Sequence, residues 1–212
     1  MEDLIYMGLI PIDLSELVAS GGMNAIQYQY FNQLMNHRTI VLNDEIDGCL
    51  IETVILPLKD FEEDDSNAPV TLILNSPGGS VGDGLSLVNI IDNYKKPLNI
   101  IVYSYACSMG TIILCAGNKN PNVKKYCYPF TFFLFHCGHL TVSDDANSAR
   151  DYLDFSEHQD DMIKDYIFSN TNITKDEWDS HNRRQWYFGA KEAKELGLID
   201  KIIGENTIKI TD

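Results

Sequence analysis

Short apolar runs alternate with amphipathic runs between residues 39 and 136, and this alternation limits the chain to few folds. The expected strands are 39–44, 69–75, 98–104 and 130–136, and the expected helices between them are 48–63, 81–93 and 108–117. Residues 69–75 are almost continuously apolar, which is typical of a parallel strand buried on both faces. Pro57 is expected to kink the first helix or to mark a later start. This order predicts an α/β domain with crossover connections.

A long helical run over 144–170 follows the last of these strands. Its aromatic and aliphatic residues recur at helical spacing between many charges. Such a stripe either faces the core or packs on a partner subunit. The chain ends with a helix, a second helix and a strand, which are expected at 174–183, 189–196 and 198–203.

The chain is strongly acidic, with 16 Lys+Arg against 31 Asp+Glu and a net charge of −15. This charge repels polyanions, so nucleic-acid binding is not expected.

The 212 residues of the chain are enough for one α/β domain with a full core. The 5 cysteines include no Cys-x-x-Cys pair, which favours reduced thiols. No run approaches the roughly 18 apolar residues of a membrane span. We therefore expect a soluble, cytoplasmic protein without a metal or another cofactor.

Ser108 lies in a segment of small residues, ACSMG, between an expected strand and an expected helix. The first amides of a helix and the positive end of its dipole favour the negative charge that develops during acyl transfer. A serine at this place is also a common helix N-cap. Ser108 is therefore a candidate nucleophile, with capping as the alternative.

A second segment, NSPGGS, follows the preceding strand at 75–80. We expect its turn to aim the amide of Gly79 at the same point as the amide of Met109. Two such donors form an oxyanion hole. The alternative is a tight turn in which the glycines supply positive φ angles.

His136 ends an apolar strand and is the candidate general base, although a lone histidine in such a position is often structural. Cys137 follows it directly. Because adjacent strand residues point to opposite faces, Cys137 is not expected to act as a nucleophile with His136.

Together these segments resemble the Clp protease proteolytic subunit (ClpP) family of serine peptidases in the crotonase-like superfamily. The resemblance runs from about residue 28 to 204 and includes NSPGG, CSMG, KKYCYP, His136 and the final A-x-E-A-x-E-x-G, in the family's order and spacing. It implies stacked β-β-α units with a protruding handle helix over about 144–170. It also implies that Ser108 is the nucleophile and His136 the general base, and that the amides of Gly79 and Met109 form the oxyanion hole.

The same resemblance implies peptide hydrolysis in a chamber of two stacked heptameric rings. An AAA+ unfoldase would feed unfolded chains into this chamber, and the rings would contain this chain alone or a homologous ClpP subunit as well. Residues 1–27 diverge from the family, which has its axial-pore loops there. We expect them to form a separate N-terminal segment before a ClpP-like domain over 28–212.

The chain also departs from the family at the third member of the triad, where Gln185 replaces an aspartate. A glutamine carbonyl accepts the proton on Nδ1 of the base, but it is neutral and does not stabilise the imidazolium. Asp179 is the nearest upstream carboxylate that would substitute. The hypotheses are therefore a serine endopeptidase of low intrinsic activity or a catalytically impaired structural or regulatory ring subunit. A third alternative is acyl-CoA chemistry, in which two backbone amides polarise a thioester and no serine is required.

Overall fold

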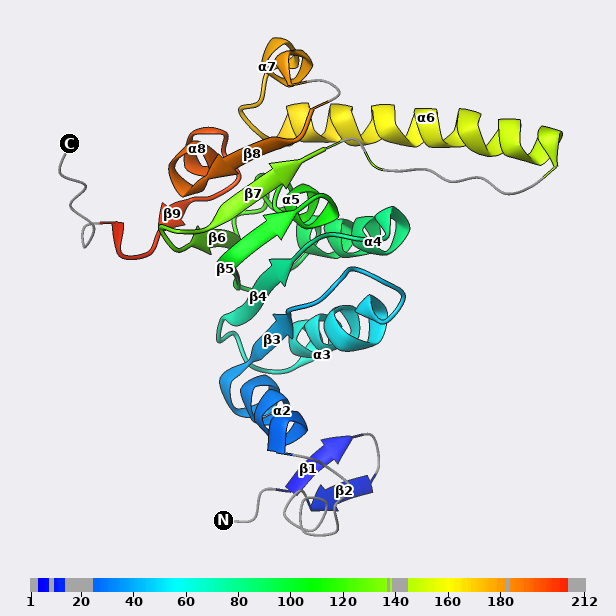
Figure 1. Ribbon diagram of the computed structural model, residues 1–212. Coiled ribbons are helices and arrows are strands. Elements are labelled where there is room, and N and C mark those ends of the chain that lie inside the picture. The colour runs from blue at the N-terminus through cyan, green and yellow to red at the C-terminus, as the bar shows by residue number, and fades with distance from the viewer. Residues whose placement is uncertain are drawn as a thin grey trace.

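The computed structural model describes residues 4–7, 10–13, 25–136, 138, 145–181 and 184–205 (Figure 1). Its strands are β1 (Leu4–Met7), β2 (Ile10–Asp13), β3 (Thr39–Leu42), β4 (Val70–Ser76), β5 (Leu98–Cys107), β6 (Val123–Cys127), β7 (Phe132–Phe135), β8 (Trp186–Gly189) and β9 (Lys201–Ile202). Its helices are α2 (Ala25–His37), the π-helix η1 (Ile51–Ile55), α3 (Leu56–Glu63), α4 (Val81–Asp92), α5 (Met109–Ile113), α6 (Ala146–Asn170), α7 (Lys175–Ser180) and α8 (Ala190–Glu195).

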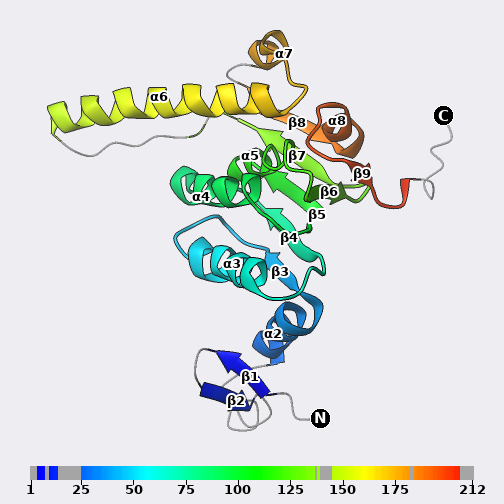
Figure 2. The same cartoon turned by 180° about the vertical axis from the view of Figure 1, so that it is seen from behind.

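The main sheet is parallel except at one edge. Its strand order is β3-β4-β5-β6-β9. Strand β7 pairs with the C-terminal residues of β5 and, on its other side, with β8. Only the β7–β8 pair in this sheet is antiparallel within the described part of the chain. Helices α3, α4 and α5 lie along one side of the sheet in both views (Figures 1 and 2). The expected α/β architecture with crossover connections is confirmed.

The strand expected at 69–75 is present as β4, but it is not buried equally on both faces. Its residues alternate between buried and half-buried along its whole length. Tyr103 and Ser104 of the neighbouring β5 are exposed. The helices cover one face of these strands more completely than the other, so the expected burial on both faces is complete on one face only.

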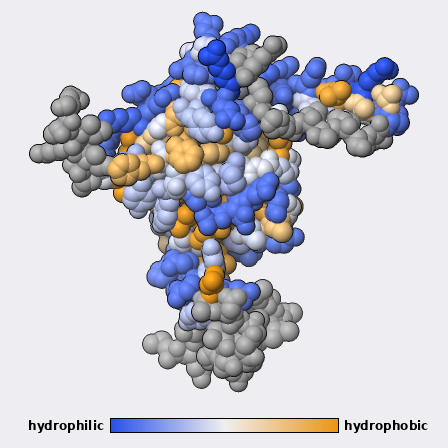
Figure 3. Space-filling model, viewed as in Figure 1, coloured by the Kyte–Doolittle hydropathy of each residue, from blue (hydrophilic) through white to orange (hydrophobic). Residues whose placement is uncertain are grey.

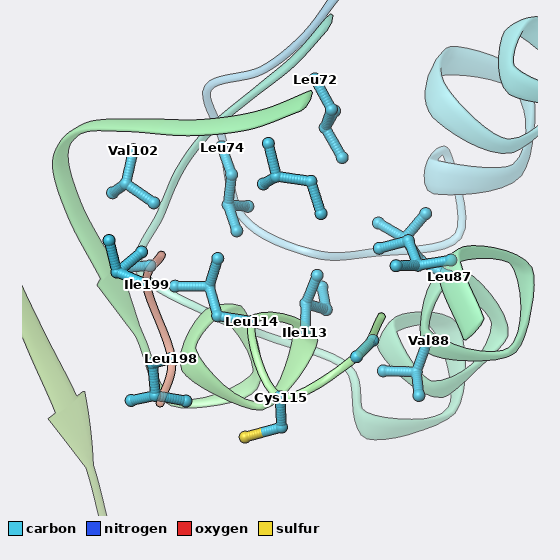
Figure 4. Packing of buried hydrophobic residues seen from close by; sticks show 14 of the residues in the cluster. Leu72, Leu74, Leu87, Val88, Val102, Ile113, Leu114, Cys115, Leu198 and Ile199 are labelled. Atoms are coloured by element: carbon cyan, nitrogen blue, oxygen red, sulfur yellow. The ribbon is translucent and has the colours of Figure 1, made fainter. Parts of the chain in front are cut away.

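Helix α5 is the centre of the core although it is short. Ile113 and Leu114 at its end are fully buried. They lie among side chains of the sheet, of α4 and of the C-terminal segment, including Leu74, Leu87 and Leu198 (Figure 4). The first turn of α5 carries Ser108 and Met109, so this packing anchors the helix start on which the candidate site depends.

Helix α6 extends well beyond the sheet (Figures 1 and 2). Ile163 and Ile167 in its C-terminal part are buried against the body. By contrast, Tyr152 and Phe155 are exposed, and apolar side chains interrupt the hydrophilic surface of the helix (Figure 3). The stripe therefore faces the core only near the C-terminal end. Among the described residues, no helix combines the length and the apolar character needed to cross a membrane.

The region expected as one helix over 48–63 differs from that expectation. A π-helical turn, η1, comes first, and α3 begins at Leu56 with Pro57 in its first turn. A proline there has no intrahelical hydrogen bond to lose, so it starts the helix instead of kinking it. Strands β6 and β8 and helix α2 were not foreseen as elements.

Candidate active site

Ser108 is the residue between β5 and α5, and its backbone is strained. Its φ is 53° and its ψ is −123°, a region that residues other than glycine rarely adopt. Such a conformation costs about 1–3 kcal/mol and persists only where the surrounding structure enforces it. A sharp strand-to-helix turn of this kind presents a serine hydroxyl at the end of a strand. Ser108 is half-buried and lines a cleft.

The turn is held by hydrogen bonds to the neighbouring strand β7. The amide of Ser108 donates to the carbonyl of Leu134 at 2.8 Å. The hydroxyl of Thr111, which is fully buried, lies 2.7 Å from the carbonyl of Ala106 and 2.9 Å from that of Leu134. Thr111 thus joins β5, β7 and α5 around the candidate nucleophile. Sequence reasoning missed this residue, although it lies three positions after Ser108.

The Pro77-Gly78-Gly79 turn packs directly against Ser108. A Cβ added to Gly78 would lie 2.6 Å from the Cβ of Ser108, and φ at Gly78 is +99°. The amide of Gly78 donates to the Ser76 hydroxyl at 3.1 Å. The predicted glycine turn with positive φ is therefore present, and only glycine fits its closest approach to the serine.

Gly79 is held by a parallel bridge to Ile46. Ile46 donates to the carbonyl of Gly78 at 2.8 Å and accepts from the amide of Ser80 at 2.7 Å. In this pattern the amide of Gly79 points away from Ile46. Within the described part of the chain, neither this amide nor that of Met109 has a protein acceptor. Both donors are thus available to a ligand.

His136 follows β7 and is half-buried. Phe135 before it lies in an aromatic cluster. Its ring centroid is 5.3 Å from that of Trp178 and 5.9 Å from that of Trp186. This packing fixes the end of the strand and with it the backbone of His136. Cys137, the rejected alternative nucleophile, is outside the described residues.

Gln185 lies just before β8, which pairs with β7. The register ends at the pair of Phe135 and Trp186, so His136 and Gln185 each lie one residue beyond it. Gln185 is exposed, and no hydrogen bond joins it to His136 among the described residues.

A cleft of about 640 Å³ brings several of these residues together. Ser108, Met109 and His136 line it, whereas Gly79 and Gln185 do not. Asp179, named from the sequence as a substitute carboxylate, also lines it. The other wall comes from α6 and α7, of which the sequence had connected only Asp179 in α7 with the site.

Cys107 immediately precedes the candidate nucleophile but is poorly suited to replace it. Its side chain is buried, and this burial raises the pKa of its thiol. A raised pKa keeps the sulfur in its less nucleophilic protonated form at neutral pH.

An α/β fold that carries a strained serine turn and a histidine on one cleft places the chain in the broad class of hydrolases. The chain belongs to the Clp protease family, because the family model "Clp protease" matches residues 22–206. Members of this family are peptidases that form oligomeric rings and work with AAA+ unfoldases.

A curated relative agrees with this assignment. The chain is 29% identical over 188 residues to the ATP-dependent Clp protease proteolytic subunit of Streptococcus mutans serotype c (strain ATCC 700610 / UA159). The match covers 86% of this chain and 92% of that protein.

Proposed function

We propose that this chain is a serine endopeptidase that hydrolyses unfolded polypeptides within an oligomeric chamber. The observation that carries the proposal is that Ser108, on its strained turn, shares one cleft with His136. The amides of Gly79 and Met109 are the proposed oxyanion donors. No metal or other cofactor is required by this chemistry.

In the proposed reaction the Ser108 hydroxyl attacks the scissile carbonyl while His136 removes its proton. The carbonyl oxygen becomes an oxyanion, which the two amides stabilise. His136 then returns the proton to the leaving amine, and an acyl-enzyme ester remains on Ser108. Water, deprotonated by the same histidine, hydrolyses this ester and restores the serine.

Gln185 is the proposed third member, because Gln185 and His136 each lie one residue beyond the last β7–β8 pair. Its neutral carbonyl orients the imidazole but adds no negative charge beside the imidazolium. In serine-protease triads, exchanging the aspartate for its amide lowers turnover about 10⁴-fold. We therefore expect low intrinsic activity.

The alternative function is that of a catalytically impaired ring subunit that builds or regulates a chamber with an active homologue. The loss of the acidic residue at position 185 favours this alternative. Both functions need assembly, and the exposed apolar residues of α6 supply a surface for it. Heptameric rings, stacked in pairs and served by an AAA+ unfoldase, are the proposed arrangement for either.

Intact-mass analysis after treatment with an alkyl fluorophosphonate tests the proposal on particles of verified assembly state. We expect one slow addition to the wild type and none to Ser108→Ala. Gln185→Asp should accelerate labelling by roughly tenfold or more, because a carboxylate then faces His136. Gln33→Asp makes the same exchange at an exposed position of α2 and should change nothing.

The possible outcomes separate the two functions. If only Gln185→Asp is labelled, the chain is the impaired subunit. If neither the wild type nor Gln185→Asp is labelled at Ser108, the proposed roles of Ser108 and His136 are wrong.

A further inference from the structure

The cleft beside Ser108 has an apolar floor and a charged rim. Ile112, Phe135, Ile163, Ile167, Phe168 and Trp178 supply the floor. Ile163 and Ile167 are buried and Phe168 and Trp178 are half-buried, so the floor is a packed part of the body. Phe168 and Trp178 hold each other with ring centroids 5.9 Å apart.

The charges of the rim are predominantly negative. Its ionisable side chains are Asp160, Asp161, Asp165, Asp179, Lys164, Lys175 and, beside the serine, His136. Lys164 and Asp161 form an ion pair at 3.0 Å, so their opposite charges balance each other. Of the remaining acids, Asp160, Asp165 and Asp179 have no ion-pair partner within the described ranges, and they outnumber Lys175.

These two features fit one kind of substrate side chain. A lysine or arginine lays an apolar stem along an apolar surface and keeps its charged end near polar groups or water. A glutamate end group would instead meet three carboxylates. The net charge of −15 also raises the local concentration of cationic peptides.

We propose that this cleft selects lysine or arginine beside the scissile bond, with Asp160, Asp165 and Asp179 as the specificity-determining residues. This inference rests on the proposed peptidase function, since it concerns the same site. Exposed carboxylates each contribute modestly, so three together give a preference of roughly tenfold at low ionic strength. Salt should reduce this preference.

The test uses three peptidyl diphenyl phosphonates that differ only in the residue bonded to phosphorus: lysine, norleucine or glutamate. Norleucine retains the lysine stem without its ammonium group. Labelling rates are measured by intact mass on assembled wild type and on the Gln185→Asp variant, in which Ser108 is expected to react faster. The ratio of the lysine rate to the norleucine rate is independent of the reactivity of Ser108.

We expect a lysine-to-norleucine ratio of roughly ten in the wild type, with glutamate slowest. The triple variant Asp160→Asn, Asp165→Asn, Asp179→Asn should bring the ratio close to one. The matched control, Asp65→Asn, Asp151→Asn, Asp154→Asn, removes the same charge from exposed positions outside the cleft and should keep the ratio.

Two results would overturn this inference by itself. One is a wild-type ratio near or below one while the alkyl fluorophosphonate still labels Ser108, which leaves the peptidase function standing. The other is an equal fall of the ratio in the triple variant and in its control, which would assign the preference to overall charge. If the fluorophosphonate does not label Ser108 in either background, the peptidase function fails and the inference fails with it.

Discussion

Ser108 keeps its unusual backbone conformation because three neighbours act on it at once. The carbonyl of Leu134 accepts from its amide, the hydroxyl of Thr111 bridges the adjoining strands, and Gly78 leaves space for its Cβ. Leu134 and Gly78 are distant from Ser108 in sequence, whereas Thr111 lies three positions after it and acts through its bonds to the strands. The strain is thus supported by tertiary contacts of this turn.

Gly78→Ala should therefore disable the site. The new methyl group would lie 2.6 Å from the Cβ of Ser108 and 2.7 Å from the carbonyl oxygen of Cys107. Displacement of a catalytic group by about 1 Å lowers rates about 10²-fold, so we expect at least that loss of fluorophosphonate labelling. Gly82→Ala is the matched control because a Cβ there has nothing within 4 Å. It should retain labelling and stabilise α4 by about 0.5–1 kcal/mol. Normal labelling of Gly78→Ala would show that the turn tolerates movement.

For single residues, the sequence indicated which of them lie together better than how their backbone is held. Ser108, Met109 and His136 were named from the sequence, and they line one cleft. The positive φ of Ser108 was not predictable, because a serine has no intrinsic preference for it. Thr111 was missed because a threonine inside an apolar helix gives no signal of the strands that it joins.

The elements were predictable where their burial is simple. Strands β4 and β5 and helix α4 match the expected runs within a few residues, because their apolar periodicity reflects direct contact with the core. Strand β8 lies at an edge, and its burial alternates over only four residues, too few for a periodic signal. The division into η1 and α3 depends on Pro57 and on packing. A later helix start at Pro57 was one of two alternatives from the sequence, but the π-helical turn was not predicted.

Hydrogen bonds add to the apolar packing that attaches α6 to the body, and one of them runs from the side chain of Asn118 to the carbonyl of Asn170. Tyr166 donates from its hydroxyl to Asp92 at the end of α4, at 2.7 Å. The other oxygen of Asp92 accepts from the amide of Gly117 at 2.7 Å. Burial and the Asp92 carboxylate raise the pKa of Tyr166, so it stays a donor at neutral pH.

Tyr166→Phe should reduce the free energy of unfolding by about 1.5–3 kcal/mol, because it removes a hydrogen bond to a carboxylate. Tyr152→Phe, at an exposed position of the same helix, should change it by less than about 0.5 kcal/mol. Urea denaturation of both variants, in the same assembly state as the wild type, measures the difference. Equal effects would mean that the Tyr166 hydroxyl does not hold α6.

Across the whole molecule, a charge network connects segments that are distant in sequence. Asp64, after α3, accepts from Arg38 before β3 and from Lys96 before β5, the latter at 2.8 Å. Arg38 also lies over the ring of Phe61 at 4.5 Å. The network therefore clamps the beginnings of β3 and β5 to the end of α3. Asp64 thus has two cationic partners in a chain that carries 31 acidic residues.

This network predicts how stability depends on acid. Hydrogen bonds from Arg38 and Lys96 lower the pKa of Asp64 to about 2, below its value in the unfolded chain. A depressed native pKa adds stability that is complete above about pH 4 and is lost as the pH falls through about 2. Because Asp64 is 34% exposed, solvent screening limits this contribution to about 1 kcal/mol.

Asp64→Asn should therefore be less stable than wild type at pH 7 by about that amount, and this gap in the free energy of unfolding should close between pH 4 and pH 2. Denaturant titrations at several pH values measure it, with the exposed Asp65→Asn as the control for general charge. A gap that is constant down to pH 2 would show that lost packing, not the ionised carboxylate, accounts for the effect.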